Sequence, residues 1–419
     1  MSDMTAHKAH VATIDEVVTT VIMARVTDFF GFFVYAIASA LVFPTVFFPM
    51  LSPTAGLMAS FAVFSLAFLA RPVSSLMARR LQYVIGRPAK VAAALMILGT
   101  ATVAIGLLPS YERIGWLAPT LLIALRILQG IGLGGSWDGL TLQLQDAAPE
   151  GRKGAYAIIP QLGGPIGFAV ASALFFVLTG FLTEEEFLQW GWRFAFFAAM
   201  ALNVVSLFAR IRLLSTDFGA DQSRLQSAPL RPLIRDQWRE ILLSAFVPLA
   251  SYALLHVVTV FPLGYVTLFG SEPISSILLT QMLGAGCAIV TVIISGSLAD
   301  RYNRRTVMFI STLLIILLCL ALPFLQDAPR IFILFGFVVL GLAYGQAGAI
   351  VPKRFREEYR YSGSALSTNL SWIIGAAFAP LVALTLAVNF GVTAVALYLL
   401  SGAAATLIAL RLLNRREAR

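Results

Sequence analysis

Twelve long apolar stretches fill most of this 419-residue chain. Each stretch is near or above the ~20 residues that an α-helix needs to cross the hydrocarbon core of a bilayer. A spanning helix also satisfies its own backbone hydrogen bonds, which lipid cannot do. We therefore expect an all-α membrane protein with twelve transmembrane helices, placed at residues 22–48, 56–78, 89–109, 117–143, 155–182, 191–213, 240–268, 275–298, 306–326, 331–351, 361–388 and 391–413.

Lys and Arg gather in alternate connections between these stretches. The basic connections are residues 79–90, 152–153, 210–239, 301–305, 353–360 and 411–419, and the connections between them hold few basic residues. Short basic loops stay on the cytoplasmic side of a membrane. We therefore expect both termini to be cytoplasmic. The net charge of +9 lies in these loops, so it gives no reason to expect a nucleic-acid partner.

Composition excludes most other classes of protein. A chain that is 59% hydrophobic and 12% charged is far from the average of soluble domains. Both cysteines, Cys287 and Cys319, fall inside expected spans and have no metal-ligand spacing. The polar first residues do not resemble a cleaved signal peptide. We expect a multi-pass monomer surrounded by lipid, in a bacterial plasma (inner) membrane, with no metal, no cofactor and no enzymatic activity.

The spans divide into two sets of six. The longest polar interruption separates an N-terminal six-helix bundle (1–213) from a C-terminal one (239–419), with a cytoplasmic linker at 214–238. A basic turn follows the second span, at Ile85 to Pro88, and another follows the eighth, at Gly296 to Arg305. Turns at matching places in the two halves indicate an internal repeat, as many transporters have.

Two motifs resemble those of one known family. The run from Gly296 to Arg305 fits G-x-L-A-D-R-x-x-R-R, and Arg126 to Gly130 fits R-x-x-Q-G, which are both signatures of the major facilitator superfamily. Further segments resemble its metabolite:proton symporter family, whose permeases carry proline/betaine, citrate, α-ketoglutarate and shikimate. These segments include Asp28 to Phe30, Phe68 to Pro72 and Trp190 to Arg193. The resemblance implies the major facilitator fold and secondary active transport of a small metabolite with protons.

The second basic turn is a candidate conformational latch. A glycine permits close helix contact, a carboxylate can cap a helix, and guanidinium groups can bind carbonyl oxygens. The expected latch residues are Gly296, Asp300, Arg301, Arg304 and Arg305. The alternative is a loop that only sets topology. In the first-half turn, Arg79 and Tyr83 replace the Gly and Asp of the family pattern, so we expect the stronger latch at Asp300.

Charged residues inside the spans are candidates for the transport pathway. A charge at the centre of a bilayer costs at least ~2.5 to 3.5 kcal/mol, so it normally faces the protein interior or a wet cavity. Arg25 and Asp28 share a helix face, as do Arg126 and Gln129. The alternative for each is a buried pair that only fixes helix packing. The candidates are Arg25, Asp28, Arg71, Arg126, Gln129, Asp138 and His256, together with neutral groups that could line a cavity, namely Tyr35, Gln161, Tyr252, Gln281, Asn369 and Trp372.

The resemblance adds roles to some of these positions and removes others. Asp28, Arg71, Arg126 and Gln129 match family positions, and Arg126 would belong to the substrate or proton network. Two family carboxylates are missing, because Arg25 and Ser136 stand where the family has Glu. If proton coupling survives, Asp28 is the leading proton carrier, with Arg25 or Arg126 tuning its proton affinity. The other candidates for that role are Asp138, Asp146 and His256.

The balance of interior charges favours an anionic or zwitterionic solute. The candidates above hold three arginines against two aspartates. We expect a carboxylate-bearing metabolite that is taken up with protons. Two alternatives stay open, a proton-antiport exporter and a solute sensor of the same fold that moves nothing.

Overall fold

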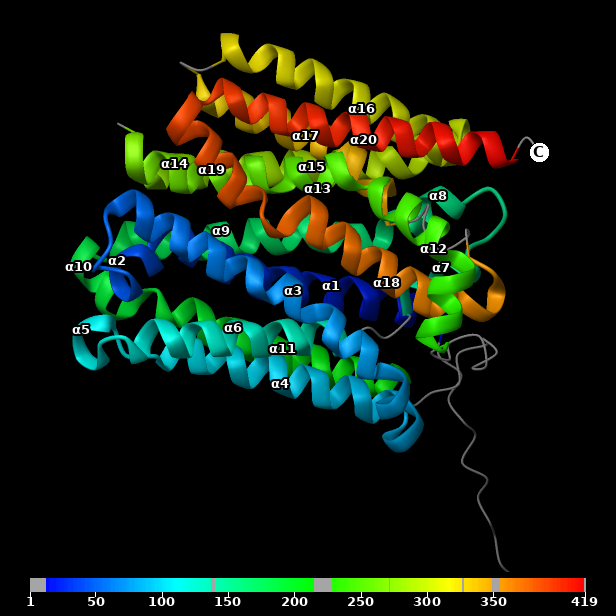
Figure 1. Ribbon diagram of the computed structural model, residues 1–419, viewed down its shortest axis with the longest axis horizontal. Helices are drawn as coiled ribbons and strands as arrows, with labels where there is room; N and C mark the ends of the chain where they lie inside the picture. The colour runs from blue at the N-terminus through cyan, green and yellow to red at the C-terminus, as the bar shows by residue number, and fades with distance from the viewer. Residues whose placement is uncertain are drawn as a thin grey trace, which may run out of the picture.

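The computed structural model describes residues 13–136, 140–214, 228–270, 272–325, 328–348 and 355–417. Within them, twelve helical segments are long and apolar enough to cross a membrane, and these confirm the expected spans. The long helices run side by side along the longest axis of the molecule (Figure 1). The expected all-α membrane fold is therefore present.

Six of these segments belong to the N-terminal half. They are α1 (Ile14–Leu41), α3 (Pro53–Ile85), α4 (Arg87–Leu107), α6 (Leu117–Gly135), α8 (Lys153–Ile158) continuing through a 3₁₀ turn into α9 (Gly163–Phe181), and α11 (Arg193–Leu214). Short helices α2 (Phe43–Phe47), α5 (Tyr111–Ile114), α7 (Leu140–Asp146) and α10 (Glu184–Glu186) lie between them. Helix α1 begins eight residues before the expected 22, because Thr13 and Glu16 form a capping box that extends the helix outward.

The C-terminal half supplies the other six. They are α12 (Leu230–Phe246) with α13 (Leu249–Thr259) and α14 (Phe261–Phe269), α15 (Ile274–Tyr302), α16 (Arg304–Ala321), α17 (Pro329–Ala347), α18 (Arg360–Trp372) with α19 (Ala379–Phe390), and α20 (Thr393–Glu417). Helix α12 begins inside the stretch expected as a linker, because Leu233 and Ile241 pack with Phe355 and Tyr359. The division of the chain at 214–238 stays a prediction, since residues 215–227 lie outside the described part.

The internal repeat extends to backbone geometry. Gly86, which ends α3, and Asn303, which ends α15, both have positive φ angles, of 80° and 85°. The two halves share a second sequence feature, which the sequence analysis did not identify. Val42-Phe43-Pro44 interrupts the first span and Val260-Phe261-Pro262 interrupts the seventh. Proline has no N–H to donate, so each helix breaks at the same place in its half.

A side chain from a neighbouring helix repairs the second of these breaks. Pro262 cannot donate to the carbonyl of Val258, which lies four residues before it. The amide of Gln281, on α15, donates instead to the carbonyl oxygens of Val258 and Thr259, at 2.9 and 2.6 Å. Gln281 is fully buried, so it secures α13 rather than lining an open cavity.

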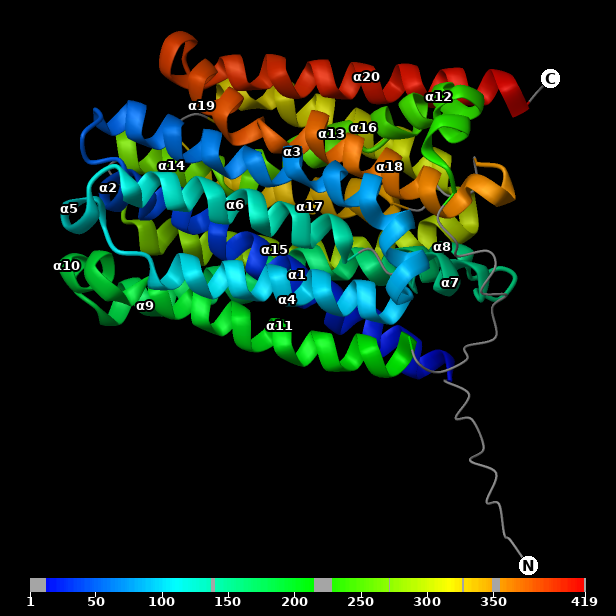
Figure 2. The ribbon, with the colours of Figure 1, turned by 60° about the horizontal axis from the view of Figure 1, so that its bottom comes forward.

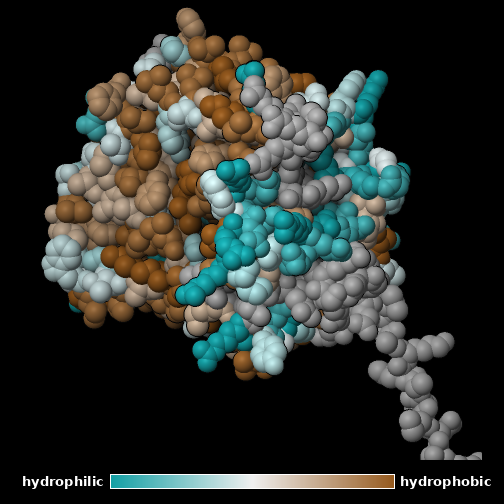
Figure 3. Space-filling view, turned by 45° about the vertical axis from the view of Figure 1, so that its right-hand side comes forward, coloured by the Kyte–Doolittle hydropathy of each residue, from teal (hydrophilic) through white to brown (hydrophobic). Residues whose placement is uncertain are grey.

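The two ends of the molecule differ. Helix α1 begins and α20 ends at the same end as α7, α8 and the start of α12, whereas α2, α5 and α10 lie at the opposite end (Figure 2). We call the first the basic end, because Arg80, Arg152, Arg304 and Arg360 lie there. We call the other the pocket end. A hydrophilic patch covers the basic end beside an apolar flank (Figure 3), as expected for a protein surrounded by lipid.

Candidate functional site

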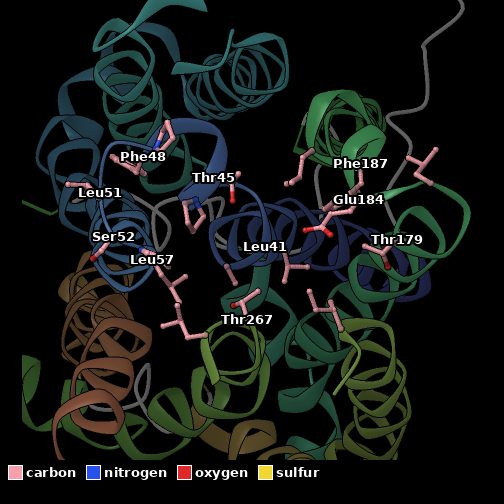
Figure 4. Close-up of a pocket in the computed structure, with 18 of the residues that line it drawn as sticks. Leu41, Thr45, Phe48, Leu51, Ser52, Leu57, Thr179, Glu184, Phe187 and Thr267 are labelled. Carbon is pink, nitrogen blue, oxygen red and sulfur yellow. The ribbon is translucent and has the colours of Figure 1, made fainter. Parts of the chain in front are cut away.

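A cavity of about 670 Å³ opens at the pocket end, between the two halves. Figure 4 shows Phe48, Leu51 and Ser52 on one side of it and Glu184 and Phe187 on the other. Thr267 and Ile274 bring α14 and α15 of the second half to its wall. The cavity is large enough for a small solute. Glu184 is the single charged residue among the described residues that line it.

Aromatic rings from both halves meet between the two bundles. We call Phe29, Phe32, Phe64, Phe68, Tyr252, His256, Tyr344 and Trp372 the aromatic core. Phe68 of α3 stacks on Trp372 of α18, with ring centroids 6.0 Å apart, and Tyr252 of α13 stacks on the same indole at 4.4 Å. Such ring pairs prefer centroid distances of roughly 4.5–7 Å. The aromatic core therefore joins the halves by direct contact.

His256 lies in the aromatic core, on α13. Its side chain is fully buried, and neither ring nitrogen has a hydrogen-bond partner. Its neighbours are the rings of Phe32, Phe64 and Phe68, at centroid distances of 5.8, 5.6 and 6.5 Å. Leaving a buried polar group without a partner costs roughly 1–3 kcal/mol. His256 is thus inside the protein as expected, and its role as a proton relay stays a prediction.

Arg126 is buried inside the N-terminal half. Its Nε and Nη2 both donate to the carbonyl oxygen of Phe64, at 3.2 and 3.1 Å, and its Nη1 donates to Gln129 at 3.0 Å. Gln129 in turn donates to Thr102. The guanidinium lies 3.6 Å from the ring centre of Tyr35, a close cation–π contact. These contacts link α6, α3, α4 and α1, and the role of Arg126 as a solute contact stays a prediction.

Asp28 forms an ion pair that the sequence reasoning missed. Its Oδ2 lies 2.6 Å from Arg210 on α11 and 3.9 Å from Arg25 on its own helix. Arg210 also donates to the carbonyl oxygen of Ala24 and is 2% exposed. By sequence, Arg210 falls at the start of the basic connection 210–239. The spacing of Asn203, Ser206 and Arg210 could have indicated a buried Arg210, because these residues fall on one helix face. All three are buried in the structure.

Arg71 differs from the other interior arginines. Its guanidinium lies 5.9 Å from the ring centre of Trp372, which belongs to the other half. It is near enough to Tyr252 and Tyr344 to interact with them electrostatically. Among the described residues it has no salt bridge, and its Nε is buried without an acceptor. Arg25 is also close, and its Nη2 donates to Thr141 at 3.2 Å.

The remaining candidates lie at several places. Tyr35 is fully buried under Arg126 and its hydroxyl has no partner, so it does not line the cavity. Gln161 reaches from the 3₁₀ turn before α9 to Gly348, beyond the end of α17. Asn369 is buried on α18, three residues before Trp372. Asp138 lies outside the described residues.

The expected latch residues connect the halves at the basic end. Asp300 accepts hydrogen bonds from the backbone N–H groups of Gly154 and Ala155, in the first turn of α8. A carboxylate is favourable there because helix N-termini expose unpaired N–H groups. Arg304 donates to the carbonyl oxygen of Lys153.

Gly154 makes this contact possible, and two of the expected arginines form contacts within their own turn. A Cβ added at Gly154 would lie 2.6 Å from the carbonyl oxygen of Gly296, so close approach needs glycine. Arg301 packs instead over Tyr302 of its own helix, 5.1 Å from the ring centre. The backbone N–H of Arg305 donates to the side chain of Asn303 within the turn.

The first-half turn has no such carboxylate, and other residues connect the halves nearby. Tyr83, at the aspartate position of the family pattern, is 92% exposed. Asp146 of α7 instead lies 2.6 Å from Arg360 of α18. Lys90, which is almost fully buried, donates to the hydroxyl of Tyr361 at 3.3 Å. Two different sets of contacts therefore connect the halves at the basic end.

Comparison with known proteins gives a consistent answer. The profile of the Major Facilitator Superfamily matches residues 28–371. An inner membrane metabolite transport protein of Escherichia coli (strain K12) is 38% identical over 416 residues, covering 95% of this chain and 93% of that protein. The shikimate transporter of the same organism is 32% identical, with 90% and 89% covered. A citrate-proton symporter of Klebsiella pneumoniae is 29% identical, with 85% and 82% covered.

Solved structures show the same fold. A crystal structure of a D-xylose-proton symporter matches with a TM-score of 0.72, covering 95% of this chain and 97% of that one, at 14% identity. At this identity the likeness concerns the fold alone.

Proposed function

This chain belongs to the major facilitator superfamily, and from that premise we propose that it carries a small carboxylate-bearing metabolite into the cell together with protons. At the coarser level, it is a multi-pass inner-membrane transporter of metabolites and not an enzyme, since its relatives are metabolite transporters with matching spans. It also belongs with the metabolite:proton symporters of that superfamily. The solute class, the coupling and the direction are the proposal.

One observation supports a carboxylate group on the solute. Arg126 is held by carbonyl and amide oxygens, and Arg210 is paired with Asp28. Arg71 is different, because it lies against Trp372 of the opposite half and has no salt bridge among the described residues. A cation between the halves attracts an anion, and the planar guanidinium suits a carboxylate. We therefore assign the negative group of the solute to Arg71.

The two ends of the molecule suggest a direction of access. We propose that the basic end faces the cytoplasm, because Lys and Arg residues are retained there. The cavity at the pocket end would then open to the outside, while Asp300 and Arg360 keep the basic end closed. The structure would represent an outward-facing state. Transport requires these contacts to break while the pocket end closes.

We place the coupling proton on Asp28. Its Oδ2 is paired with Arg210, whereas its buried Oδ1 has no hydrogen-bond partner. Protonation of this carboxylate would release Arg210 from its ion pair. A change of that kind can favour one arrangement of the helices over another.

Uptake into proteoliposomes tests the proposal. Radiolabelled shikimate and citrate, which relatives carry, are supplied with and without an inward proton gradient. We expect accumulation only with the gradient, and we expect Arg71→Gln to abolish it while the exposed Arg113→Gln does not. Proton-driven loss of preloaded acid would instead make the protein an exporter. Binding without any flux would make it a sensor.

A further inference from the structure

The unpartnered imidazole of His256 points to a specific class of solute. A neutral imidazole offers one donor and one acceptor. Both nitrogens are buried among Phe32, Phe64 and Phe68, with no protein group to bond. A hydroxyl group can both donate and accept, so it can pair with either nitrogen of a neutral imidazole. A carboxylate can only accept.

The rings beside His256 are arranged for a flat partner. Phe68 and Trp372 are nearly parallel, with 16° between their planes, and Tyr252 also stacks on the indole, with 23° between the planes. Phe68 and Trp372 belong to different halves. A ring inserted between them needs planes about 7 Å apart, because each stacking contact takes ~3.5 Å. The two ring centroids are 6.0 Å apart here, so the rings must move apart to admit another ring.

Arg71 lies close to the same stack. Its guanidinium is 5.9 Å from the ring centre of Trp372, and its buried Nε has no acceptor. Trp372 contacts Phe68, which contacts His256. Arg71, the rings of Trp372 and Phe68, and the imidazole of His256 therefore form a chain of contacts across the interface. Arg71 can bind an anion, the rings offer flat faces, and His256 can bind a hydroxyl.

We propose that the aromatic core binds a ring-bearing hydroxy acid, with its carboxylate on Arg71, its ring between Phe68 and Trp372, and a hydroxyl on His256. This inference rests on the proposed function, because it names the solute class of the same site. It makes His256 a specificity-determining contact. Acyclic acids lack the flat face, and ring acids without a hydroxyl leave His256 unpaired.

Binding to the purified protein in lipid nanodiscs tests this, with tryptophan fluorescence as the readout. The probes are 4-hydroxybenzoate and shikimate, benzoate as the ring acid without a hydroxyl, and citrate as the acyclic acid. We expect His256→Leu to weaken 4-hydroxybenzoate binding at least tenfold and benzoate binding less than twofold. His256→Gln keeps a donor and an acceptor and should recover much of the loss.

The control variant is Ser251→Ala, which removes a different buried polar group of α13, a hydroxyl that donates to the carbonyl oxygen of Pro248. It should leave all four affinities unchanged. Equal weakening of benzoate and 4-hydroxybenzoate in His256→Leu would overturn the inference. So would wild-type protein that binds citrate as tightly as the ring acids, or that binds neither hydroxy acid.

The outcomes separate this inference from the proposed function. Wild-type protein that binds 4-hydroxybenzoate in nanodiscs but moves no acid in proteoliposomes would support the site and contradict transport. Wild-type protein that accumulates citrate with a proton gradient and binds no ring acid would support transport and contradict the site. The melting temperature of each variant identifies any that fail to fold.

Discussion

The carboxylate of Asp28 lies 2.6 Å from the guanidinium of Arg210 and joins α1 to α11 inside the N-terminal half. Arg210 is 2% exposed, and the Asp28 side chain is 13% exposed. Breaking a buried pair leaves an uncompensated charge, which costs roughly 3–5 kcal/mol. The pair is therefore important for stability as well as a candidate for coupling.

Removing one member of this pair should separate its two roles. We expect Asp28→Asn to lower the melting temperature and to abolish concentrative uptake, while exchange of solute across the membrane continues. Exchange needs no net movement of protons. The measurements are thermal unfolding and paired uptake and counterflow assays. Wild-type accumulation by Asp28→Asn would transfer the coupling role to Asp138, Asp146 or His256.

Asp28→Asn combined with Arg210→Gln is the matched test of the stability role. Because the double variant leaves no buried charge at position 210, we expect it to melt above Asp28→Asn, with a coupling energy of about 1 kcal/mol or more in a double-mutant cycle. Accumulation should stay absent. Additive losses of stability would show that the two residues do not act as a pair.

The sequence predicted the spans well because each is long, apolar and separated by charged turns. It also singled out Gly296 and Asp300, since both belong to a local motif, and their role as a latch stays a prediction. The sequence did not predict contacts between helices that lie far apart in the chain. Nothing in the loop sequence states that Asp300 caps α8, and Arg210 was assigned to a loop because basic residues also mark topology. Contacts across the fold depend on packing that a single sequence does not display.

We expect the contact of Asp300 with α8 to hold the basic end closed. Asp300→Ala removes the acceptor of two backbone N–H groups, of Gly154 and Ala155. Capping contacts of this kind contribute about 0.5–2 kcal/mol. We expect the variant to populate more of the state open at the basic end. Electron–electron distances between spin labels at Arg152 and Tyr302 should lengthen, whereas Glu150→Ala, on the same surface, should change nothing.

Asp146 and Arg360 predict a smaller effect at the same end. Their side chains are 44% and 23% exposed, so solvent screens the pair. Exposed ion pairs contribute about 0.2–1 kcal/mol. We expect Asp146→Arg to shift the same spin-label distances less than Asp300→Ala does. Exchanging the two charges, with Arg360→Asp added, should restore the wild-type distribution. If the exchange restores nothing, the pair does not hold the halves together.

The proposed orientation predicts which positions react from outside the cell. In a background without Cys287 and Cys319, a cysteine at Glu185 should react with a membrane-impermeant maleimide on intact cells. A cysteine at Arg152 should react only after the cells are opened. Both positions are exposed in the structure. Labelling of Arg152→Cys on intact cells would reverse the orientation.

Replacing Arg126 by lysine should have the opposite effects on stability and solute affinity from replacing Arg71 by lysine. Arg126→Lys keeps a cation, but an ammonium cannot reproduce the planar fork that bonds the carbonyl of Phe64 and the amide of Gln129 together. We expect this variant to melt several degrees lower and to keep its affinity for the transported acid within about threefold, a change of less than 1 kcal/mol. Arg71→Lys should melt like the wild type and bind the acid at least tenfold more weakly, because Arg71 has no salt bridge to lose among the described residues. Isothermal titration and thermal unfolding on the same preparations compare the two. If Arg126→Lys loses affinity while its melting temperature is unchanged, Arg126 is itself a contact of the solute, and the anion site must include it.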